Sequence, residues 1–275
     1  MSRILFLLLA LVVFCGDLYS QININFISVG YGDCCFIEEI SEPNINILVD
    51  AGHKHNFKKI KKYLKGKNIK NIDYVFITHP HENHYGSLSE IIKSFEVKKL
   101  YWNGDARNRS LEESEFLRFL EKTENNGKSA MILYSGDVLD LSDDLKLEVL
   151  NPDIIEGSVN DAALVLKMYY KKIGFIIASD IGPNAQRRIH KSLGNQAKYK
   201  LDTQIMTYPH HGDCLIEEWQ DCLRSLKYLI IQTGPNVYGN IPSLKGLKIN
   251  PIVLRTDADG DIVLESDGEN VWLRK

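Results

Sequence analysis

A histidine-rich segment, Thr78–His84, most constrains what this chain can fold into. It reads Thr-His-Pro-His-Glu-Asn-His and follows an apolar, β-type run at residues 72–77. His79 and His81 are two positions apart, so in an extended backbone their rings leave the same side, while His84 follows where the chain turns. Neutral imidazole is the commonest metal ligand among protein side chains. The segment therefore predicts a metal site at the end of a buried strand.

Two more strand ends carry residues of the same kind. An apolar run at 173–178 is typical of a strand buried on both faces, and it leads into Ser179–Asp180. A run at 204–209 leads into His210–His211. A buried carboxylate is costly unless it is paired, and a metal ion is one such partner. Because five of the eight histidines fall in two short clusters, we favour one shared site over separate structural roles.

Elsewhere short apolar runs alternate with amphipathic helical stretches. We expect strands at residues 22–29, 35–37, 45–49, 72–77, 99–102, 146–150, 163–169, 173–178, 204–207, 228–232, 252–255, 261–266 and 271–273. We expect helices at residues 57–65, with Gly66 as the stop, and at 88–95, 111–122, 184–193 and 215–225. A chain with 44% hydrophobic and 25% charged residues can bury a large core, and this composition does not point to disorder or a repeat array. One domain with two β-rich halves, covered by helices, is the simplest account.

The first twenty residues are typical of a signal peptide. Arg3 precedes an apolar stretch, Ile4–Phe14, which is too short to span a bilayer comfortably. We therefore expect a signal peptide at 1–20 and a domain at 21–275, exported to the periplasm or secreted, with no transmembrane span in the mature chain. Cys15 offers a lipoprotein anchor as the alternative, but Phe14 fits that processing poorly. Nothing in the sequence sets the oligomeric state.

Four cysteines remain after such processing: Cys34, Cys35, Cys214 and Cys222. An even number in an exported chain permits disulfides, and one of the adjacent pair would then reach Cys214. The equal alternative is that all four are small buried hydrophobic residues.

Several short motifs occur in a fixed order along the chain. They are Val29–Asp33, Leu48–Gly52, Thr78–His84, Asn160 ahead of 164–166, Ser179–Asp180, Pro209–Gly212, Tyr238–Gly239, and Arg255–Asp257 with Gly260. Together they resemble the metallo-β-lactamase fold hydrolases, whose hallmark is HxHxDH at a strand end, and in particular the carboxy-terminal metallo-β-lactamase-like domain of the ComEC type. The resemblance covers nearly all of residues 21–275.

That resemblance implies a fold of the α/β (α+β) class. It is an αββα sandwich of two mixed sheets with helices on the outer faces and an active site along one edge. It also implies a metal-dependent hydrolase that uses one or two Zn²⁺ or Mn²⁺ ions. The substrate would be a small-molecule or nucleic-acid phosphodiester, or a related compound. The net charge of −3 gives no independent support for a nucleic-acid partner.

The same resemblance assigns roles to individual residues. His79 and His81 would hold one ion, and His84 and His211 the other. Asp180 would bridge both ions and take part in catalysis. His210 is the alternative to His211, which we prefer because it directly precedes the glycine. Asp50 would order the site from behind, with Asn160 also in this outer layer.

Three positions depart from the family pattern. Asn83 replaces the aspartate of HxHxDH, a position that is both a metal ligand and catalytic. Its amide carries no charge and cannot accept a proton, so the second ion should bind more weakly. Asn240 stands where a histidine is expected, and Asp213 replaces a serine. These losses leave open the alternative of a catalytically degenerate binding protein with one or no metal ion.

Overall fold

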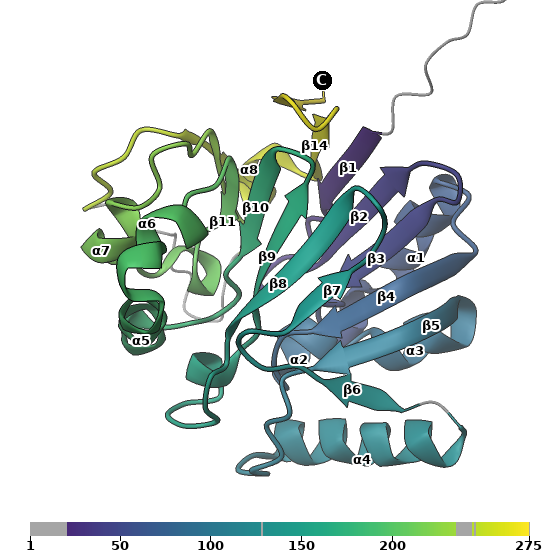
Figure 1. The fold of residues 1–275 in the computed structure, drawn as a ribbon. Coiled ribbons are helices and arrows are strands. Elements are labelled where there is room, and N and C mark those ends of the chain that lie inside the picture. The colour runs from purple at the N-terminus through teal and green to yellow at the C-terminus, as the bar shows by residue number, and fades with distance from the viewer. Residues whose placement is uncertain (1–20, 128, 235–243, 245, 275) are drawn as a thin grey trace, which may run out of the picture.

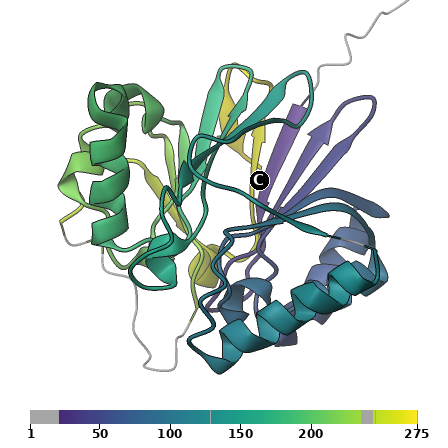
Figure 2. The same cartoon turned by 60° about the horizontal axis from the view of Figure 1, so that its bottom comes forward.

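The structure, a computed structural model, describes residues 21–127, 129–234, 244 and 246–274. Two β-sheets face each other, and helices cover the outer side of each (Figure 1). The second view gives the same layering (Figure 2). The expected αββα sandwich is therefore confirmed. The predicted signal peptide, Cys15 and the motif positions Tyr238–Asn240 lie outside the described residues.

The first sheet has eight strands, of which four are parallel neighbours. In spatial order they are β15 (Val271–Leu273), β14 (Ile262–Ser266), β1 (Gln21–Phe26), β2 (Cys35–Ile40), β3 (Ile45–Val49), β4 (Asn71–Ile77), β5 (Glu96–Trp102) and β6 (Ala130–Ile132). The run from β3 to β6 is parallel, and the other pairs are antiparallel. The helices of this half are α1 (Phe57–Gly66), the short α2 (Glu82–Tyr85), α3 (Leu88–Ser94) and α4 (Leu111–Asn125).

The second sheet has seven strands. In spatial order they are β13 (Ile252–Arg255), β12 (Tyr228–Ile231), β11 (Ile205–Thr207), β10 (Ile173–Ile177), β9 (Val165–Tyr170), β8 (Leu145–Asn151) and β7 (Val138–Asp140). Strands β10 to β13 are parallel, and β7 to β10 are antiparallel. The helices of this half are α5 (Pro183–Leu193), α6 (Ala197–Lys200), α7 (Glu217–Gln220) and α8 (Thr256–Asp259).

Three apolar layers hold the sandwich together. The inner layer lies between the sheets and includes Phe26 and Phe175. One outer layer joins the first sheet to its helices through Phe116, and the other joins the second sheet to α5 and α7 through Ile189 and Trp219. Apolar residues on alternate sides of each strand therefore serve two layers at once, which explains the nearly continuous apolar runs in the sequence.

Two secondary-structure expectations need correction. The helix expected at 215–225 is too long, because α7 ends after four residues. The Gln186 side chain accepts a hydrogen bond from the backbone N–H of Ile216 (3.0 Å), and Asp202 accepts one from that of Ser225 (2.7 Å). Side chains from other segments thus hold both ends of this stretch. The short edge strands β6 and β7 and the short helices α2, α6 and α8 were not predicted.

The disulfide expectation is wrong. All four cysteines of the described residues are free thiols. Cys34 packs in an outer layer and Cys35 in the inner layer, because successive residues of an extended chain point to opposite faces. They act as small buried hydrophobic residues, the alternative derived from the sequence.

No helix in the described part of the chain combines the length and the apolar character needed to cross a bilayer.

Candidate metal centre

The predicted site forms where strands of both sheets end. Strand β4 leads to His79, and α2 immediately afterwards carries His84, while β10 leads to Asp180 and β11 to His211. Close to these ends, four residues other than glycine have a positive φ: Asp50 (59°), Ser179 (53°), His210 (50°) and His211 (54°). Such backbone is sparsely populated and persists where the surrounding structure enforces it. The turns that present the polar side chains are therefore held by the fold.

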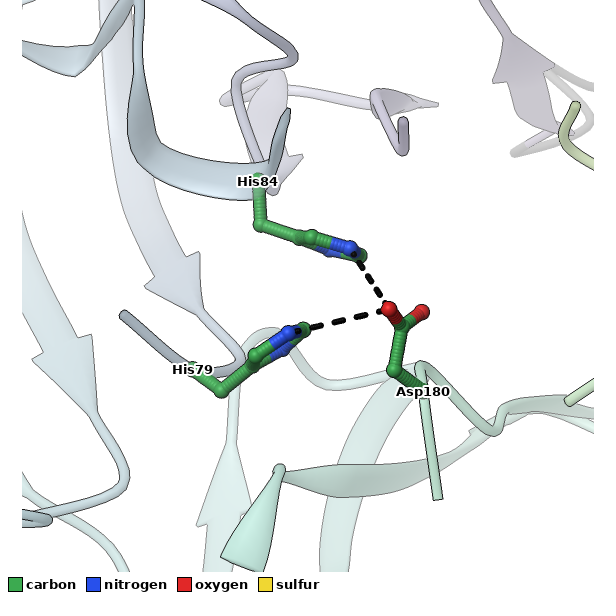
Figure 3. Close-up of side chains that lie close together, drawn as sticks. All are labelled: His79, His84 and Asp180. Atoms are coloured by element: carbon green, nitrogen blue, oxygen red, sulfur yellow. Dashed lines mark hydrogen bonds and ion pairs between the residues drawn. The ribbon is translucent and has the colours of Figure 1, made fainter. Parts of the chain in front are cut away.

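Three imidazoles converge on Asp180 (Figure 3 shows two of them). The distances from Asp180 Oδ2 are 3.2 Å to His84 Nε2, 3.4 Å to His211 Nε2 and 3.7 Å to His79 Nε2. Asp180 is only 2% exposed, and its Oδ1 atom makes no hydrogen bond. A buried carboxylate oxygen without a partner is costly, so this atom marks a place where a cation or water fits.

His81 and Asn83 line the same group of rings. His81 Nδ1 lies 3.0 Å from His79 Nε2, so the two rings do share a side as the spacing predicted. The amide Nδ2 of Asn83 lies 3.0 Å from His211 Nε2, which is the ring nitrogen that also faces Asp180. Residue 83 is thus beside His211 and Asp180, where the family pattern places it, but with an amide in place of a carboxylate.

Asp50 stands behind His84, as expected from the sequence. Its Oδ2 atom lies 2.9 Å from His84 Nδ1 and accepts a hydrogen bond from Thr78 Oγ1 (2.8 Å), while Oδ1 accepts one from the Thr78 backbone N–H (2.9 Å). Thr78 Oγ1 in turn accepts a hydrogen bond from Ser179 Oγ (2.8 Å). Asp50 therefore fixes the ring of His84 with Nε2 toward Asp180, and Thr78 and Ser179 join the two sheets at this point.

Asp33 stands behind His211, and the sequence reasoning gave it no role. Its Oδ1 atom lies 3.2 Å from His211 Nδ1, which also donates to the backbone carbonyl of Gln232 (2.9 Å). The residue is 5% exposed. The sequence does show a carboxylate directly after the glycine-containing turn Gly30–Gly32. The family resemblance used this motif only as one of its ordered landmarks.

The protonation of the site follows from these contacts. Burial lowers the pKa of His84, but the carboxylates of Asp180 and Asp50 outweigh it and raise that pKa to about 10. Burial also lowers the pKa of His211, but the carboxylates of Asp180 and Asp33 outweigh it and raise that pKa well above its usual value. Burial and the neighbouring His84 lower the pKa of His79 and His81. Burial would raise the pKa of Asp180, but His211 and His84 hold it well below its usual range. A cation at His84 or His211 would need the unprotonated Nε2 atom, so its binding would compete with protons.

The donor set fits a divalent cation. Three groups among the described residues bring ligand atoms within 4.8 Å of one another: His79 with His84 and Asp180, Asp33 with Asp180 and His211, and Asp33 with Asp50 and His84. All of these residues are buried. Imidazole nitrogens combined with carboxylate oxygens suit zinc and manganese.

Two predicted residues lie apart from this cluster. Neither His81 nor His210 belongs to any of the three groups. His81 still contacts His79 (3.0 Å), whereas Nε2 of His210 lies 3.3 Å from the amide nitrogen of Asn160. Asn160 therefore contacts His210 and not the rings around Asp180. Of the two adjacent histidines, His211 is the one that the fold brings to the centre, in keeping with the preference stated from the sequence.

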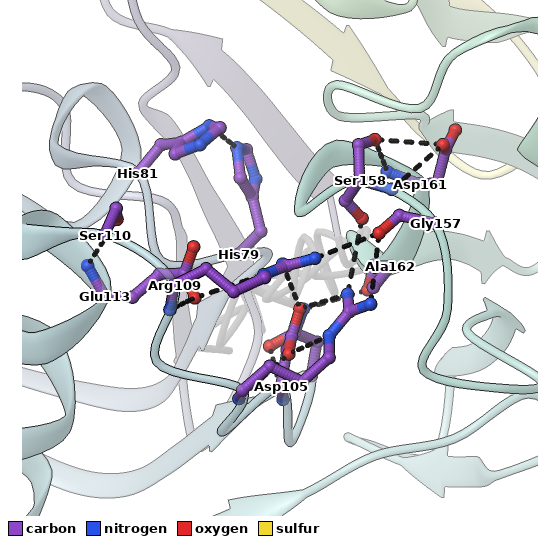
Figure 4. A network of polar contacts seen from close by, with 12 residues as sticks. His79, His81, Asp105, Arg109, Ser110, Glu113, Gly157, Ser158, Asp161 and Ala162 are labelled. Carbon is purple, nitrogen blue, oxygen red and sulfur yellow. Dashed lines mark hydrogen bonds and ion pairs between the residues drawn. The ribbon is translucent and has the colours of Figure 1, made fainter.

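An ion-pair network orders two loops on the His79–His81 side of the site (Figure 4). The buried carboxylate of Asp105 binds Arg107 (2.6 Å) and Arg109 (3.1 Å). Both guanidinium groups then donate to the backbone carbonyl of Gly157 (3.0 and 2.9 Å). The loop after β5 is thereby joined to the loop that precedes Asn160.

Comparison with known proteins identifies the family. The model of the metallo-beta-lactamase superfamily matches residues 27–228. The chain belongs to this superfamily. The resemblance inferred from the ordered motifs is thus confirmed.

Two relatives show how far the similarity extends. ComE operon protein 3 of Bacillus subtilis (strain 168) is 25% identical over 268 residues, which cover 89% of this chain and 33% of that protein. The chain thus spans about a third of that relative's length. The metallo-beta-lactamase fold protein YhfI from Bacillus subtilis is similar in structure, with a TM-score of 0.52, 11% identity, and coverage of 88% of this chain and 98% of that one. The second comparison supports the fold alone.

Proposed function

We propose that this chain is an exported metal-dependent hydrolase that acts on phosphodiester or related phosphoryl substrates. The observation that carries the proposal is the convergence of three imidazoles on Asp180, whose second oxygen is buried and has no hydrogen-bond partner. Structural histidines are usually satisfied singly by nearby backbone or side chains. A cluster around one carboxylate is instead typical of a site that holds cations.

The ligands would divide into two sets that share Asp180. His79 and His81 would hold one cation, and His84 and His211 the other, as Zn²⁺ or Mn²⁺. When bound, a divalent cation lowers the pKa of water and stabilises negative charge on phosphoryl oxygens. One or two ions are compatible with this donor set.

The protein's own groups would position the reactants. Asp180 Oδ1 is free to accept a hydrogen bond from a water molecule and so to orient it. Asp50 keeps the Nδ1 side of His84 occupied, which leaves Nε2 directed into the site. Tyr31 is 38% exposed, and its ring lies 4.3 Å from that of His211, so it offers a substrate an aromatic face at the edge of the site.

A second candidate is a binding protein that has lost catalysis. The contact that favours it is the one between Asn83 Nδ2 and His211 Nε2 (3.0 Å). An amide N–H next to this nitrogen competes with a cation for the same lone pair, and it adds no negative charge. Such a protein would use the site with one ion or none.

Metal analysis and a model reaction separate the two functions. The mature protein is purified without a metal-binding tag, its zinc and manganese are measured by mass spectrometry, and hydrolysis of bis-p-nitrophenyl phosphate is followed with and without a chelator. A hydrolase should carry close to two equivalents and lose turnover when chelated. One equivalent or none, without turnover, would support the binding protein.

Variants then test the site itself. Asp180→Asn should lower the rate by more than about 100-fold, because both cation positions depend on this carboxylate. His190→Ala, on α5, is the matched control and should keep the wild-type rate. Equal rates for Asp180→Asn and wild type would show that the reaction occurs elsewhere. Amino-terminal sequencing of the exported protein should begin at Gln21, which tests the export prediction.

A further inference from the structure

The backbone of Asp33 is bonded to the two segments that carry His84 and Asp50. Its N–H donates to the carbonyl of Asn83 (3.2 Å), and its carbonyl accepts from the N–H of Gly52 (2.8 Å). Asn83 directly precedes His84 within α2, and Gly52 lies two residues after Asp50. The location of Asp33 is thus set by the same backbone that positions His84 and Asp50.

The loop around Asp33 has no room to move aside. Gly32 has φ 153°, and a Cβ atom there would lie 2.4 Å from the Asn83 carbonyl oxygen. On the other side, a Cβ atom at Gly234 would lie 2.6 Å from the backbone of Gly30. The chain before Asp33 is therefore packed between two backbones, which fixes the backbone position of Asp33.

The Asp33 side chain is an incompletely paired buried charge. It is 7% exposed, and Oδ1 makes no hydrogen bond although it lies 3.2 Å from His211 Nδ1. Its oxygen belongs to two potential cation-binding groups, one with Asp180 and His211 and one with Asp50 and His84. A buried carboxylate in this condition needs positive charge nearby.

Asp33 and Asp50 occupy equivalent positions. Asp50 lies 2.9 Å from Nδ1 of His84, and Asp33 lies 3.2 Å from Nδ1 of His211, while both rings direct Nε2 to Asp180. On the Nε2 side of His211 lie the carboxylate of Asp180 and the uncharged amide of Asn83. The second carboxylate beside His211 therefore lies behind its ring, at Asp33, and not in front of it, at residue 83.

We propose that Asp33 is a positioning residue that compensates for Asn83. It holds His211 with Nε2 directed at the second cation and supplies, from behind the ring, the negative charge that residue 83 lacks. This inference rests on the metal site of the proposed function but does not require catalysis. It predicts that carboxylates at positions 33 and 83 substitute for each other in cation binding.

Zinc affinity in a double-mutant cycle tests the proposal. The full-length mature protein and the variants Asp33→Asn, Asn83→Asp and Asp33→Asn/Asn83→Asp are stripped of metal and titrated with zinc against a chromophoric chelator. Asp33→Asn should weaken the second zinc by about 10–100-fold, and adding Asn83→Asp should restore most of this loss. Asp140→Asn removes an exposed carboxylate that pairs with Lys146 at the surface and should bind zinc as wild type does.

Three results would overturn the inference. They are wild-type zinc affinity in Asp33→Asn, an equal gain from Asn83→Asp with and without Asp33, and no second zinc in wild type. If Asp33→Asn does not fold, Asp33→Ser removes the same charge with a smaller side chain, and its rescue by Asn83→Asp decides the question. Compensated zinc binding without hydrolysis in any variant would refute the proposed function and leave the role of Asp33 intact.

Discussion

Replacing Asp50 by asparagine should separate the structural and the metal-binding roles of the residues behind the site. The two oxygens of Asp50 accept from three donors: the Thr78 backbone N–H, Thr78 Oγ1 and His84 Nδ1. Asparagine has a single oxygen. In either orientation, its NH₂ group faces a donor, so at least one buried donor loses its partner.

The expected loss of stability follows from these contacts. An unsatisfied buried donor costs about 1–3 kcal/mol, and a hydrogen bond to a charged group contributes about 1.5–3 kcal/mol. Burial raises the pKa of Asp50, although His84 lowers it. Burying the Asp50 charge therefore costs free energy, and Asp50→Asn removes part of that cost. We therefore expect Asp50→Asn to lower the free energy of unfolding by about 2–4 kcal/mol in the presence of a chelator.

Excess zinc should increase the difference in the free energy of unfolding between wild type and Asp50→Asn. Substitution of a residue that orients a metal ligand typically lowers affinity about 10–100-fold. At saturating zinc this removes about 1.4–2.7 kcal/mol of the stabilisation that the ion provides. Urea unfolding with chelator and with excess zinc measures the two contributions separately.

A control variant makes the result interpretable. Asp140→Asn removes an exposed carboxylate that pairs with Lys146 at the molecular surface, and it should change stability by less than about 1 kcal/mol in both conditions. If Asp50→Asn behaved like this control, with the same increment from zinc as wild type, Asp50 would neither support His84 nor influence an ion.

Two further predictions concern the surroundings of the site. Burial would raise the pKa of Asp105, but hydrogen bonds from Arg107 outweigh it and lower the pKa below 3.8. The charged Asp105 therefore stabilises the folded protein above about pH 4, and this contribution is lost as the pH falls through the lowered pKa of Asp105. Asp105→Asn should cost about 1–3 kcal/mol at pH 7, and acid titration of unfolding should show its difference from wild type vanishing toward pH 2; a constant difference would contradict this. Gly32→Ala should place Cβ against the Asn83 carbonyl, lower the melting temperature and weaken zinc binding, whereas Gly66→Ala, with nothing within 4 Å, should alter neither.

The sequence predicted the fold and the centre of the site because both depend on local patterns. Apolar runs marked most strands, and polar residues at their ends marked the edge where His79, Asp180 and His211 meet. The edge strands β6 and β7 were not predicted because three-residue, partly exposed strands carry little periodic signal. The short α7 was missed because distant side chains, which helical spacing does not reveal, limit it.

The role of Asp33 was also beyond sequence reasoning. That role depends on the contact between buried Asp33 and His211, some 180 positions further along the chain. No local sequence pattern encodes this contact. The contact of Asn160 with His210 is a similar case. Such relations become visible only when both sheets are in place.

The division of the ligands between the sheets has a mechanical consequence. His79 and His84 come from one half of the sandwich, and Asp180 and His211 come from the other. A bound cation would contact ligands from both sheets, so its release and the separation of the two sheets become coupled. When metal is scarce, the contact between the sheets near the site would then weaken first, while each sheet kept its own helices.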